Sequence, residues 1–495
     1  MKKKIVFAAL GVVALMLAAA GLLTAWFYIG GMEAEDMPLS DSADLCWSPV
    51  EIADEDNAFI AVLAATNHIR LATNSWGGVD TTFIGSYGNL RDHNSRRIRA
   101  EAGAVEKADR ILADNAAFYA AFAKGLERNG FRNTLPPPIA LRHAMLPASK
   151  FMCMAWLWQF KIQRDAELGE WDNAVESIET LHRFGRMVSD NSALITDLYL
   201  GNGITGMAYA KICDIVSLGG LRDDQLARLA ALVEADEMVE KDNIVQVVKS
   251  EHAFMRANVS EMSPEMLIGL YAYGSKVHGR VFEVLAAVSG LSVSKGPSFS
   301  DRLSDFLVRT LFRWPGYFGY TLHRRTTLSS LEDIVRGIVE GDARSAVCRC
   351  GDEPKSLLSR NALGREIVHT FASSIEWVTD GTSRRKQMFA RIRAQLVLAA
   401  ARWRRAHNGE LPPALDALVP KCLSAVPLDP WAKDGEPLNY DAESGVAWSV
   451  GKDGRFNYMV MKNAKPTVQR QAKDRIVSCS FRLDGKPLEI TDESK

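Results

Sequence analysis

Residues 166–184, AELGEWDNAVESIETLHRF, place a glycine between two segments whose apolar residues recur at helical spacing. Gly169 suits a tight corner, because glycine adopts left-handed backbone conformations without steric cost. The amphipathic segments on either side of it predict two helices joined by a short loop. Since short connections favour antiparallel neighbours, the stretch predicts a helical hairpin.

The same pattern extends outward from this hairpin, from about residue 53 to residue 380. Residues 141–220 predict successive helical hairpins that end at Gly219 and Gly220, and the prolines at 136–138 mark a break before them. We therefore expect a mainly α fold whose middle domain is a stack of helical hairpins.

The 166–184 stretch also resembles the helix-turn-helix unit of tetratricopeptide repeats. Gly169 stands at the corner, Trp171 in the aromatic position and Ala174 where the two helices approach. The sequence contains one such match, whereas about three repeats are needed to bury a continuous face. We expect an irregular helical domain that includes one such hairpin.

The composition excludes one class of partner. The chain has 495 residues, with 59 basic and 60 acidic side chains and a formal net charge of -1. A chain of this length predicts two or three folded units. Its balanced charge gives no general attraction for DNA or RNA, so we expect no nucleic-acid partner.

The N-terminus predicts a membrane anchor. Three lysines at 2–4 precede an uncharged run over residues 5–32, which exceeds the roughly 20 residues that cross a bilayer as a helix. Trp26 and Tyr28 fall where an interfacial aromatic belt would lie. The run is longer than the apolar stretch of a cleaved signal peptide, although the small residues at 18–20 leave cleavage open as an alternative.

The lysines orient this predicted span with its N-terminus in the cytoplasm. Later apolar segments carry charged residues that are costly at the bilayer centre, so we expect a single pass. The expected location is the inner (cytoplasmic) membrane, with residues 33–495 in the periplasm.

Seven cysteines are present, which leaves at least one unpaired within a monomer. Cys153 and Cys213 stand in apolar helical contexts that favour buried thiols. Cys422 and Cys479 both fall in the C-terminal part of a chain that we place in an oxidising compartment. A disulfide between these two is therefore a hypothesis.

A C-terminal helix precedes a change of pattern near residue 408. Its apolar stripe is Phe389, Ile392, Leu396, Ala399 and Trp403. Asn408 and Gly409 predict the end of the helix, and Pro412 and Pro413 prevent its continuation.

The segment 425–441, AVPLDPWAKDGEPLNYD, predicts an extended chain that turns sharply. Pro427 and Pro430 fix the backbone, Asp429 suits a turn, and Trp431 is expected to pack on Leu396, Ala399 and Trp403 of the preceding helix. The alternating segments EPLNYD, VAWSV and FNYMVM predict short strands, so this part should be an α+β module with a small antiparallel sheet.

The order of these features resembles the C-terminal domain of the major pseudopilins of type II secretion systems. The motif residues are Gly409, Pro412, Pro427, Asp429, Pro430, Trp431, Tyr440, Gly451, Asp453 and Gly454. The resemblance covers about residues 385–456, and DRIVSCSFRL (474–483) is a candidate closing strand.

The chain also departs from that family. It lacks the family's short leader and the glutamate of its hydrophobic helix, so assembly into a pseudopilus is not expected. The resemblance makes Asp453 a weak calcium candidate, but Arg455, Phe456 and Asn457 follow where further acidic residues would supply oxygen ligands.

The whole arrangement resembles membrane-anchored envelope proteins of the Planctomycetes and Lentisphaerae. Four segments are predicted: a transmembrane signal anchor over 1–32, an extracytoplasmic helical domain over 33–345, a connection and helix over 346–381, and a pseudopilin-like module over 382–495.

No catalytic, cofactor or metal motif stands out, and we expect no cofactor. The favoured function is a periplasmic scaffold or protein-binding protein of the cell envelope, related to secretion or pilus-like systems. The alternative is an envelope enzyme, hydrolase-like, whose site no linear motif reveals.

Overall fold

We describe a computed structural model of the chain over residues 20–26, 45, 51–70, 81–90, 95–132, 141–236, 241–263, 320, 322–341, 360–379, 381–433, 435–462 and 473–488. The chain forms two compact units. Unit 1 comprises residues 1–48, 136–140 and 248–376, and unit 2 comprises residues 49–135, 141–247 and 377–495.

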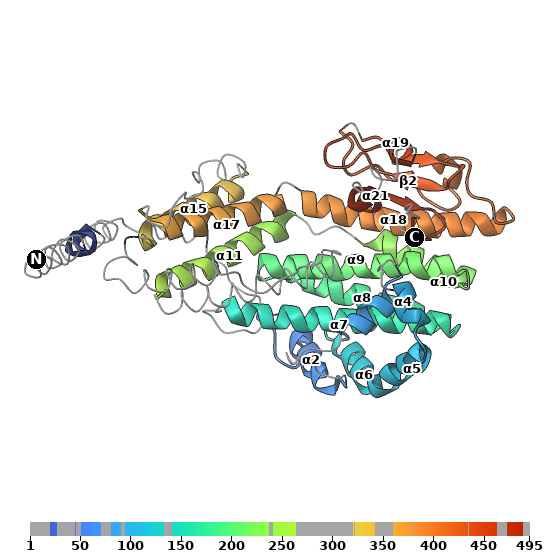
Figure 1. Cartoon of the computed structure of the whole chain (residues 1–495), viewed down its shortest axis with the longest axis horizontal. Coiled ribbons are helices and arrows are strands. Elements are labelled where there is room, and N and C mark those ends of the chain that lie inside the picture. The colour runs from blue at the N-terminus through green and yellow to red at the C-terminus, as the bar shows by residue number, and fades with distance from the viewer. Residues whose placement is uncertain are drawn as a thin grey trace, which may run out of the picture. The chain divides into compact units, whose positions relative to one another are not determined.

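Helices dominate the described residues, as the sequence predicts (Figure 1). The longer helices of unit 2 are α2 (Ala58–Ala65), α3 (Thr81–Gly88), α5 (Ala104–Asp114), α6 (Ala116–Gly125), α7 (Leu141–Glu167), α8 (Trp171–Asp190), α9 (Ile195–Leu218), α10 (Asp223–Ala235) and α18 (Thr382–Ala406). Its shorter elements are η2 (Thr66–His68), α4 (Ser95–Ala100), η3 (Leu415–Leu418), β1 (Asn439–Asp441), β2 (Val446–Trp448), α19 (Tyr458–Lys462), α21 (Lys473–Cys479) and β3 (Ser480–Arg482).

Unit 1 contains α15 (Arg324–Val339), most of α17 (Ala362–Thr379) and much of α11 (Lys241–Glu261). The start of α15 and the start of α17 are joined by Asn361, whose side-chain oxygen accepts hydrogen bonds from His323 N at 2.8 Å and from Thr327 Oγ1 at 3.3 Å. These bonds fix the two helix starts to each other.

The predicted hairpin is confirmed as α7 and α8. Gly169 lies between them with a φ of 78°, in the left-handed region. Ala174 is fully buried, and the ring of Trp171 packs so closely on Gly220 that a Cβ there would lie 1.8 Å from it. Gly219 ends α9 in the same left-handed conformation, as the sequence indicates.

The α8 and α9 helices form the most extensive helix pair in the structure. A Cβ on Gly201 would lie 2.3 Å from the backbone nitrogen of Ser189, and one on Gly185 would lie 2.4 Å from Oγ1 of Thr205. Both glycines are buried, so the two backbones approach closely because neither glycine adds a side chain at the crossing.

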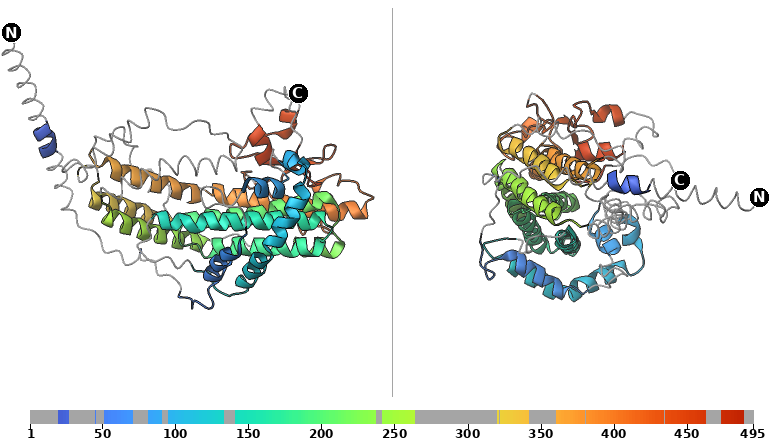
Figure 2. Two further views of the ribbon diagram at one scale, coloured as in Figure 1. Left: turned by 60° about the horizontal axis from the view of Figure 1, so that its bottom comes forward. Right: turned by 90° about the vertical axis from the view of Figure 1, so that its left-hand side faces the viewer.

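One hydrophobic core runs through unit 2 and includes both the early helices and α18. Helices α7, α8, α9 and α10 lie alongside one another, α18 packs on α9 and α10, and α2 packs on α6 (Figures 1 and 2). The boundaries of units 1 and 2 differ from those of the predicted segments 33–345, 346–381 and 382–495.

The α18 helix is buried on more than its predicted stripe. Phe389, Ile392, Leu396 and Ala399 are buried as expected, but so are Ala394, Val397, Leu398 and Ala400. The wider burial arises because α18 packs against α9 and α10 and also supports the C-terminal module. Its end is confirmed, with Gly409 at a φ of 89° donating a hydrogen bond to the Arg404 carbonyl at 2.7 Å.

A three-stranded antiparallel sheet with the order β1-β2-β3 completes the module. The strands predicted in EPLNYD and VAWSV are present, and SFR closes the sheet. The strand predicted in FNYMVM is wrong, because residues 458–462 form α19. Asn457 caps that helix by accepting hydrogen bonds from Met459 N at 2.9 Å and Val460 N at 3.4 Å.

The predicted membrane anchor falls largely on residues 1–19 and 27–32, which lie outside the described residues. Residues 20–26 are helical. Within the described ranges, no helix combines the length and the apolar character that a membrane crossing requires. The span stays a prediction.

We predict that Gly201→Ala lowers the free energy of unfolding by about 1–3 kcal/mol, because the added methyl group would overlap the backbone of Ser189. Gly203 is the matched control on the same helix, since a Cβ there meets nothing within 4 Å. Gly203→Ala should stabilise by up to about 1 kcal/mol through helix propensity. Chemical denaturation of both variants is the measurement, and equal effects would contradict the close crossing.

Candidate functional site

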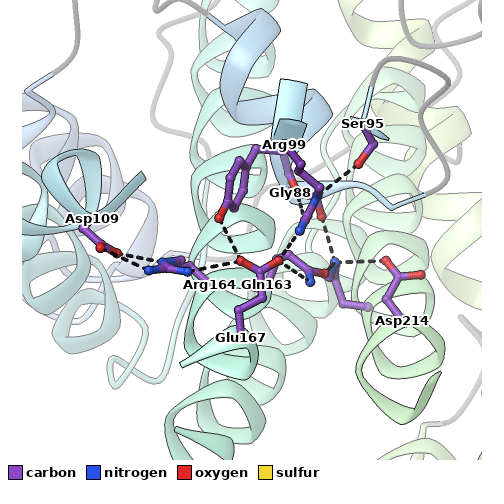
Figure 3. Close-up of polar contacts among 10 residues, drawn as sticks. Gly88, Ser95, Arg99, Asp109, Gln163, Arg164, Glu167 and Asp214 are labelled. Atoms are coloured by element: carbon purple, nitrogen blue, oxygen red, sulfur yellow. Dashed lines mark hydrogen bonds and ion pairs between the residues drawn. The ribbon is translucent and has the colours of Figure 1, made fainter. Parts of the chain in front are cut away.

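A buried lysine belongs to a polar network inside unit 2 that runs from Asp214 to Asp109 (Figure 3). The side chain of Lys211, on α9, is fully buried, and its ammonium group donates three hydrogen bonds. The acceptors are Gly88 O at 2.7 Å, Gln163 Oε1 at 2.6 Å and Asp214 Oδ2 at 2.9 Å. Lys211 therefore ties α9 to α3 and to α7.

Glu167, the last residue of α7, lies in the middle of this network (Figure 3). Its carboxylate accepts hydrogen bonds from Gln163 Nε2 at 3.0 Å and Tyr87 OH at 2.8 Å. It also forms a close ion pair with Arg99 of α4. Arg99 in turn bonds to the Tyr87 carbonyl and, at 3.2 Å, to Ser95 Oγ.

Arg164 extends the network to α5. Its guanidinium group binds Asp109 through two hydrogen bonds, of 2.7 and 3.1 Å, and reaches Glu167 at 3.4 Å. The two-pronged geometry is the strong form of an arginine–carboxylate contact.

The charges of this network balance. Its cations are Lys211, Arg99 and Arg164, and its anions are Asp214, Glu167 and Asp109. Burying such charges is costly unless each is paired and hydrogen-bonded. The network satisfies that condition with residues from α3, α4, α5, α7 and α9 (Figure 3).

The pKa values of two members reflect these contacts. Burial acts to raise the pKa of Glu167, but the hydrogen bond and charge of Arg99, with the hydrogen bonds from Tyr87 and Gln163, outweigh it and lower the pKa below its usual value. Burial, followed by the hydrogen bond to Glu167, raises the pKa of Tyr87 to about 12. Glu167 therefore remains an anion and Tyr87 a neutral donor at pH 7.

A second polar cluster joins α8, α9 and the end of α10. The carboxylate of Asp236 lies 3.6 Å from His182 Nε2 and 3.0 Å from Arg186 Nε, and it accepts a close hydrogen bond from Tyr209 OH. Arg391 of α18 donates to the backbone carbonyl of Asp236.

This second cluster holds the residue types that transfer protons in enzymes. Nε2 of His182 and the hydroxyl oxygen of Tyr209 lie 3.5 Å apart, and both residues are buried. Burial acts to raise the pKa of Asp236, but hydrogen bonds from His182 and Tyr209 and the charge of Arg186 lower it overall. The enzyme alternative stays a hypothesis, for which these residues are the candidates.

The turn predicted around Asp429 is a folding element of the C-terminal module. Asp429 is buried, and its carboxylate accepts hydrogen bonds from Trp431 N at 2.9 Å, Ser449 Oγ at 2.7 Å and Val450 N at 2.8 Å. The first bond closes the turn around Pro430, and the other two fix this turn to the chain after β2.

Trp431 packs on α18. Its ring meets the ring of Phe389 edge-on, with centroids 5.6 Å apart. Trp403 stacks instead on His407, with centroids 3.6 Å apart. Phe389 is a residue of the predicted apolar stripe, and contact of Trp431 with Leu396 and Ala399 stays a prediction.

The other motif residues also hold the module together. Tyr440 OH donates to the Pro412 carbonyl at 2.9 Å, which joins β1 to the corner after α18. Gly451 and Gly454 form the turn after β2, closed by a 2.8 Å hydrogen bond from Gly454 N to Gly451 O.

Asp453, the calcium candidate, forms an ion pair with Arg475 at 2.5 Å. A cation already lies against its carboxylate, which does not favour a calcium site. Across the described ranges, no three His, Cys, Asp or Glu side chains gather closely enough to hold a metal ion.

The predicted disulfide between Cys422 and Cys479 is wrong, since both are free thiols. Cys422 packs on the main core near α18, whereas Cys479 belongs to a small cluster around Val446, Trp448 and Phe456. The two cysteines therefore lie on different sides of the module. Cys46, Cys348 and Cys350 lie outside the described residues.

Sequence reasoning missed both buried clusters. A lysine and an aspartate three residues apart stand in the apolar stretch AKICDIV, and this placement is a signal for a buried pair. The partners of Lys211 come from distant helices, so the sequence alone does not show the network. Comparisons with family models, with curated proteins and with solved structures give no match.

We predict that Lys211→Met lowers the free energy of unfolding by about 3–5 kcal/mol, because it leaves Asp214 buried without its cation. The double variant Lys211→Met with Asp214→Leu should recover most of this loss, and urea denaturation measures both. Arg222→Ala, which removes exposed ion pairs with Asp172 and Asp224, is the control and should cost far less, because water screens exposed pairs. A double variant no more stable than the single one would rule out the pairing.

A second prediction concerns acid stability. Because the folded pKa of Glu167 is lowered, its contribution to stability is complete above the unfolded value of about 4.3 and is lost as the pH falls through the folded value. Glu167→Gln should therefore reduce the drop in stability below about pH 4. Unfolding measured across that range, with the exposed Glu410→Gln as control, tests this. The expectation fails if Glu167→Gln retains the full drop.

Proposed function

We propose that this chain is a single-pass, membrane-anchored scaffold of the cell envelope that binds a protein partner. Its N-terminus would lie in the cytoplasm and its bulk in the periplasm. The observation that supports this best is the use of buried charge. Each buried Lys, Arg, Asp and Glu side chain in the described part of the chain has a hydrogen-bond or ion-pair partner.

Many of these contacts join one helix to another. Lys211 and Glu167, with their partners, connect α3, α4, α7 and α9, and Asp236 connects the end of α10 to α8, α9 and α18. Fully satisfied buried networks, such as the one around Lys211, make a structure rigid and specify one packing arrangement. A rigid helical surface is what a scaffold offers to a partner.

The anchor is supported by the described residues 20–26. This helical piece leaves Leu22, Leu23 and Trp26 73%, 46% and 65% exposed. Clustered apolar exposure is a feature of surfaces that contact lipid or protein. With the lysines at 2–4 before it, the segment favours an N-terminus in the cytoplasm.

A relation to secretion or pilus-like systems rests on the C-terminal motif. Asp429, Trp431 and Tyr440 bind other parts of the module, so the pseudopilin-like pattern serves its folding. We infer that the chain uses such a module as a structural domain attached to the helical scaffold, as in the envelope proteins that it resembles.

The topology gives a direct test. Alkaline phosphatase and a fluorescent protein are fused in turn to the C-terminus, and the cells are assayed for each activity. A C-terminus in the periplasm should give phosphatase activity without fluorescence. Fluorescence without phosphatase activity would contradict the proposal.

The scaffold role is tested with the same chain solubilised from membranes in detergent. A protein partner should co-purify in a fixed ratio with the unaltered chain and with the control Gly203→Ala. The amount of partner that co-purifies should fall with Lys211→Met, because this substitution destabilises the packed helices. A chain that purifies without any fixed-ratio partner would argue against a scaffold.

A further inference from the structure

A small cavity lies in unit 2 where the end of α9, the start of α10, the end of α18 and the segment after β3 meet. Its volume is about 220 Å³. Its apolar lining comes from Val216, Leu221, Leu226, Ala401 and Leu483, three of which are almost fully buried. The lining is therefore built by the fold and does not depend on loose surface side chains.

Two arginines give this cavity a positive side. Arg404 is held in place by a hydrogen bond of 3.0 Å from its Nε to the carbonyl of Gly409. Its two terminal nitrogens have no partner in the described part of the chain. Arg405 pairs with Asp223, but the two side chains are 37% and 85% exposed, so water screens this pair.

One carboxylate also lines the cavity, but its charge is already compensated. Asp484 accepts hydrogen bonds from Arg482 Nε at 3.0 Å and Nη2 at 2.7 Å, and from Lys486 N at 3.1 Å. The charge offered to a ligand is therefore that of Arg404, with Arg405 beside it.

The volume indicates the size of the group that fits inside the cavity. The cavity is larger than the roughly 150 Å³ that holds benzene and smaller than the roughly 300 Å³ at which drug-sized pockets begin. An arginine with free terminal nitrogens binds a carboxylate through two parallel hydrogen bonds. Apolar walls around such an arginine suit one aromatic or branched aliphatic group.

We propose that this cavity binds a small apolar group that carries a carboxylate, with the carboxylate on Arg404 and the apolar group against Leu221, Leu226 and Leu483. A free organic acid and the C-terminal residue of a peptide share this chemistry. The site does not depend on the proposed scaffold role.

The test uses the purified full-length chain at neutral pH and titration calorimetry. The probes are 3-phenylpropanoate, its neutral amide, and a Gly-Gly-Leu peptide with either a free or an amidated C-terminus. At least one of the carboxylates should bind, and the amides should not. Arg404→Ala should weaken that binding by about tenfold or more, since it removes a charge-assisted contact.

Two further variants distinguish binding in this cavity from binding to arginines elsewhere on the surface. Ala401→Phe should abolish binding by filling the cavity while Arg404 stays in place. Arg385→Ala, which removes an exposed arginine on the same helix, should leave binding unchanged.

The outcome also identifies the source of the ligand. Binding of the acid points to small organic acids, and binding of the peptide alone points to a protein C-terminus. The proposal is overturned if no carboxylate binds, if the amides bind equally well, or if binding survives both Arg404→Ala and Ala401→Phe.

Discussion

The structure of unit 2 depends on the close crossing of α8 and α9. Gly185 and Gly201 remove the side chains that would separate the two backbones, and the neighbouring Ser189 and Thr205 are small enough to lie at the contact. This proximity brings His182 of α8 within reach of Tyr209 on α9. It also leaves other faces of α9 free to receive α7 on one side and α18 on another. A wider crossing would disturb all of these contacts together.

The buried charges add specificity to this packing. Apolar surfaces can slide against one another at small cost, whereas a paired charge fits one arrangement only. Burying ion pairs contributes little net stability, but it penalises every arrangement that leaves one partner alone. In this chain Lys211 and Glu167 fix how α3, α4, α7 and α9 align. The apolar core supplies the driving force, and the charges select one register.

The sequence predicts those features whose signals are local. Gly169 and Gly409 mark helix boundaries. Each has a left-handed backbone conformation, which glycine adopts easily, so the residue type alone indicates the turn. Asp429 forms the expected turn because its partner Trp431 is only two residues away. The FNYMVM segment misled the prediction because alternation is a weak signal over so few residues, and the cap at Asn457 outweighs it.

The clusters at Lys211 and Asp236 could not be predicted in the same way. Lys211 and its acceptor Gly88 are 123 residues apart, and Arg391 and Asp236 are 155 residues apart. A short sequence pattern does not indicate contacts between residues so far apart in the chain. The cysteines at 422 and 479 show the same limit, because a shared module does not place two side chains on one side of a sheet.

The packing of the segment after β3 onto α9 has a consequence for the order in which the chain is assembled. A Cβ on Gly485 would lie 2.4 Å from the carbonyl oxygen of Cys213, so this late segment lies directly on a helix made much earlier. During synthesis, that surface of α9 stays uncovered until the residues after β3 have been made. Such non-local contacts form slowly. Until they form, the nascent chain exposes apolar surface that a chaperone can bind. Cys213, fully buried in the finished structure, would then react with thiol reagents only while assembly is incomplete.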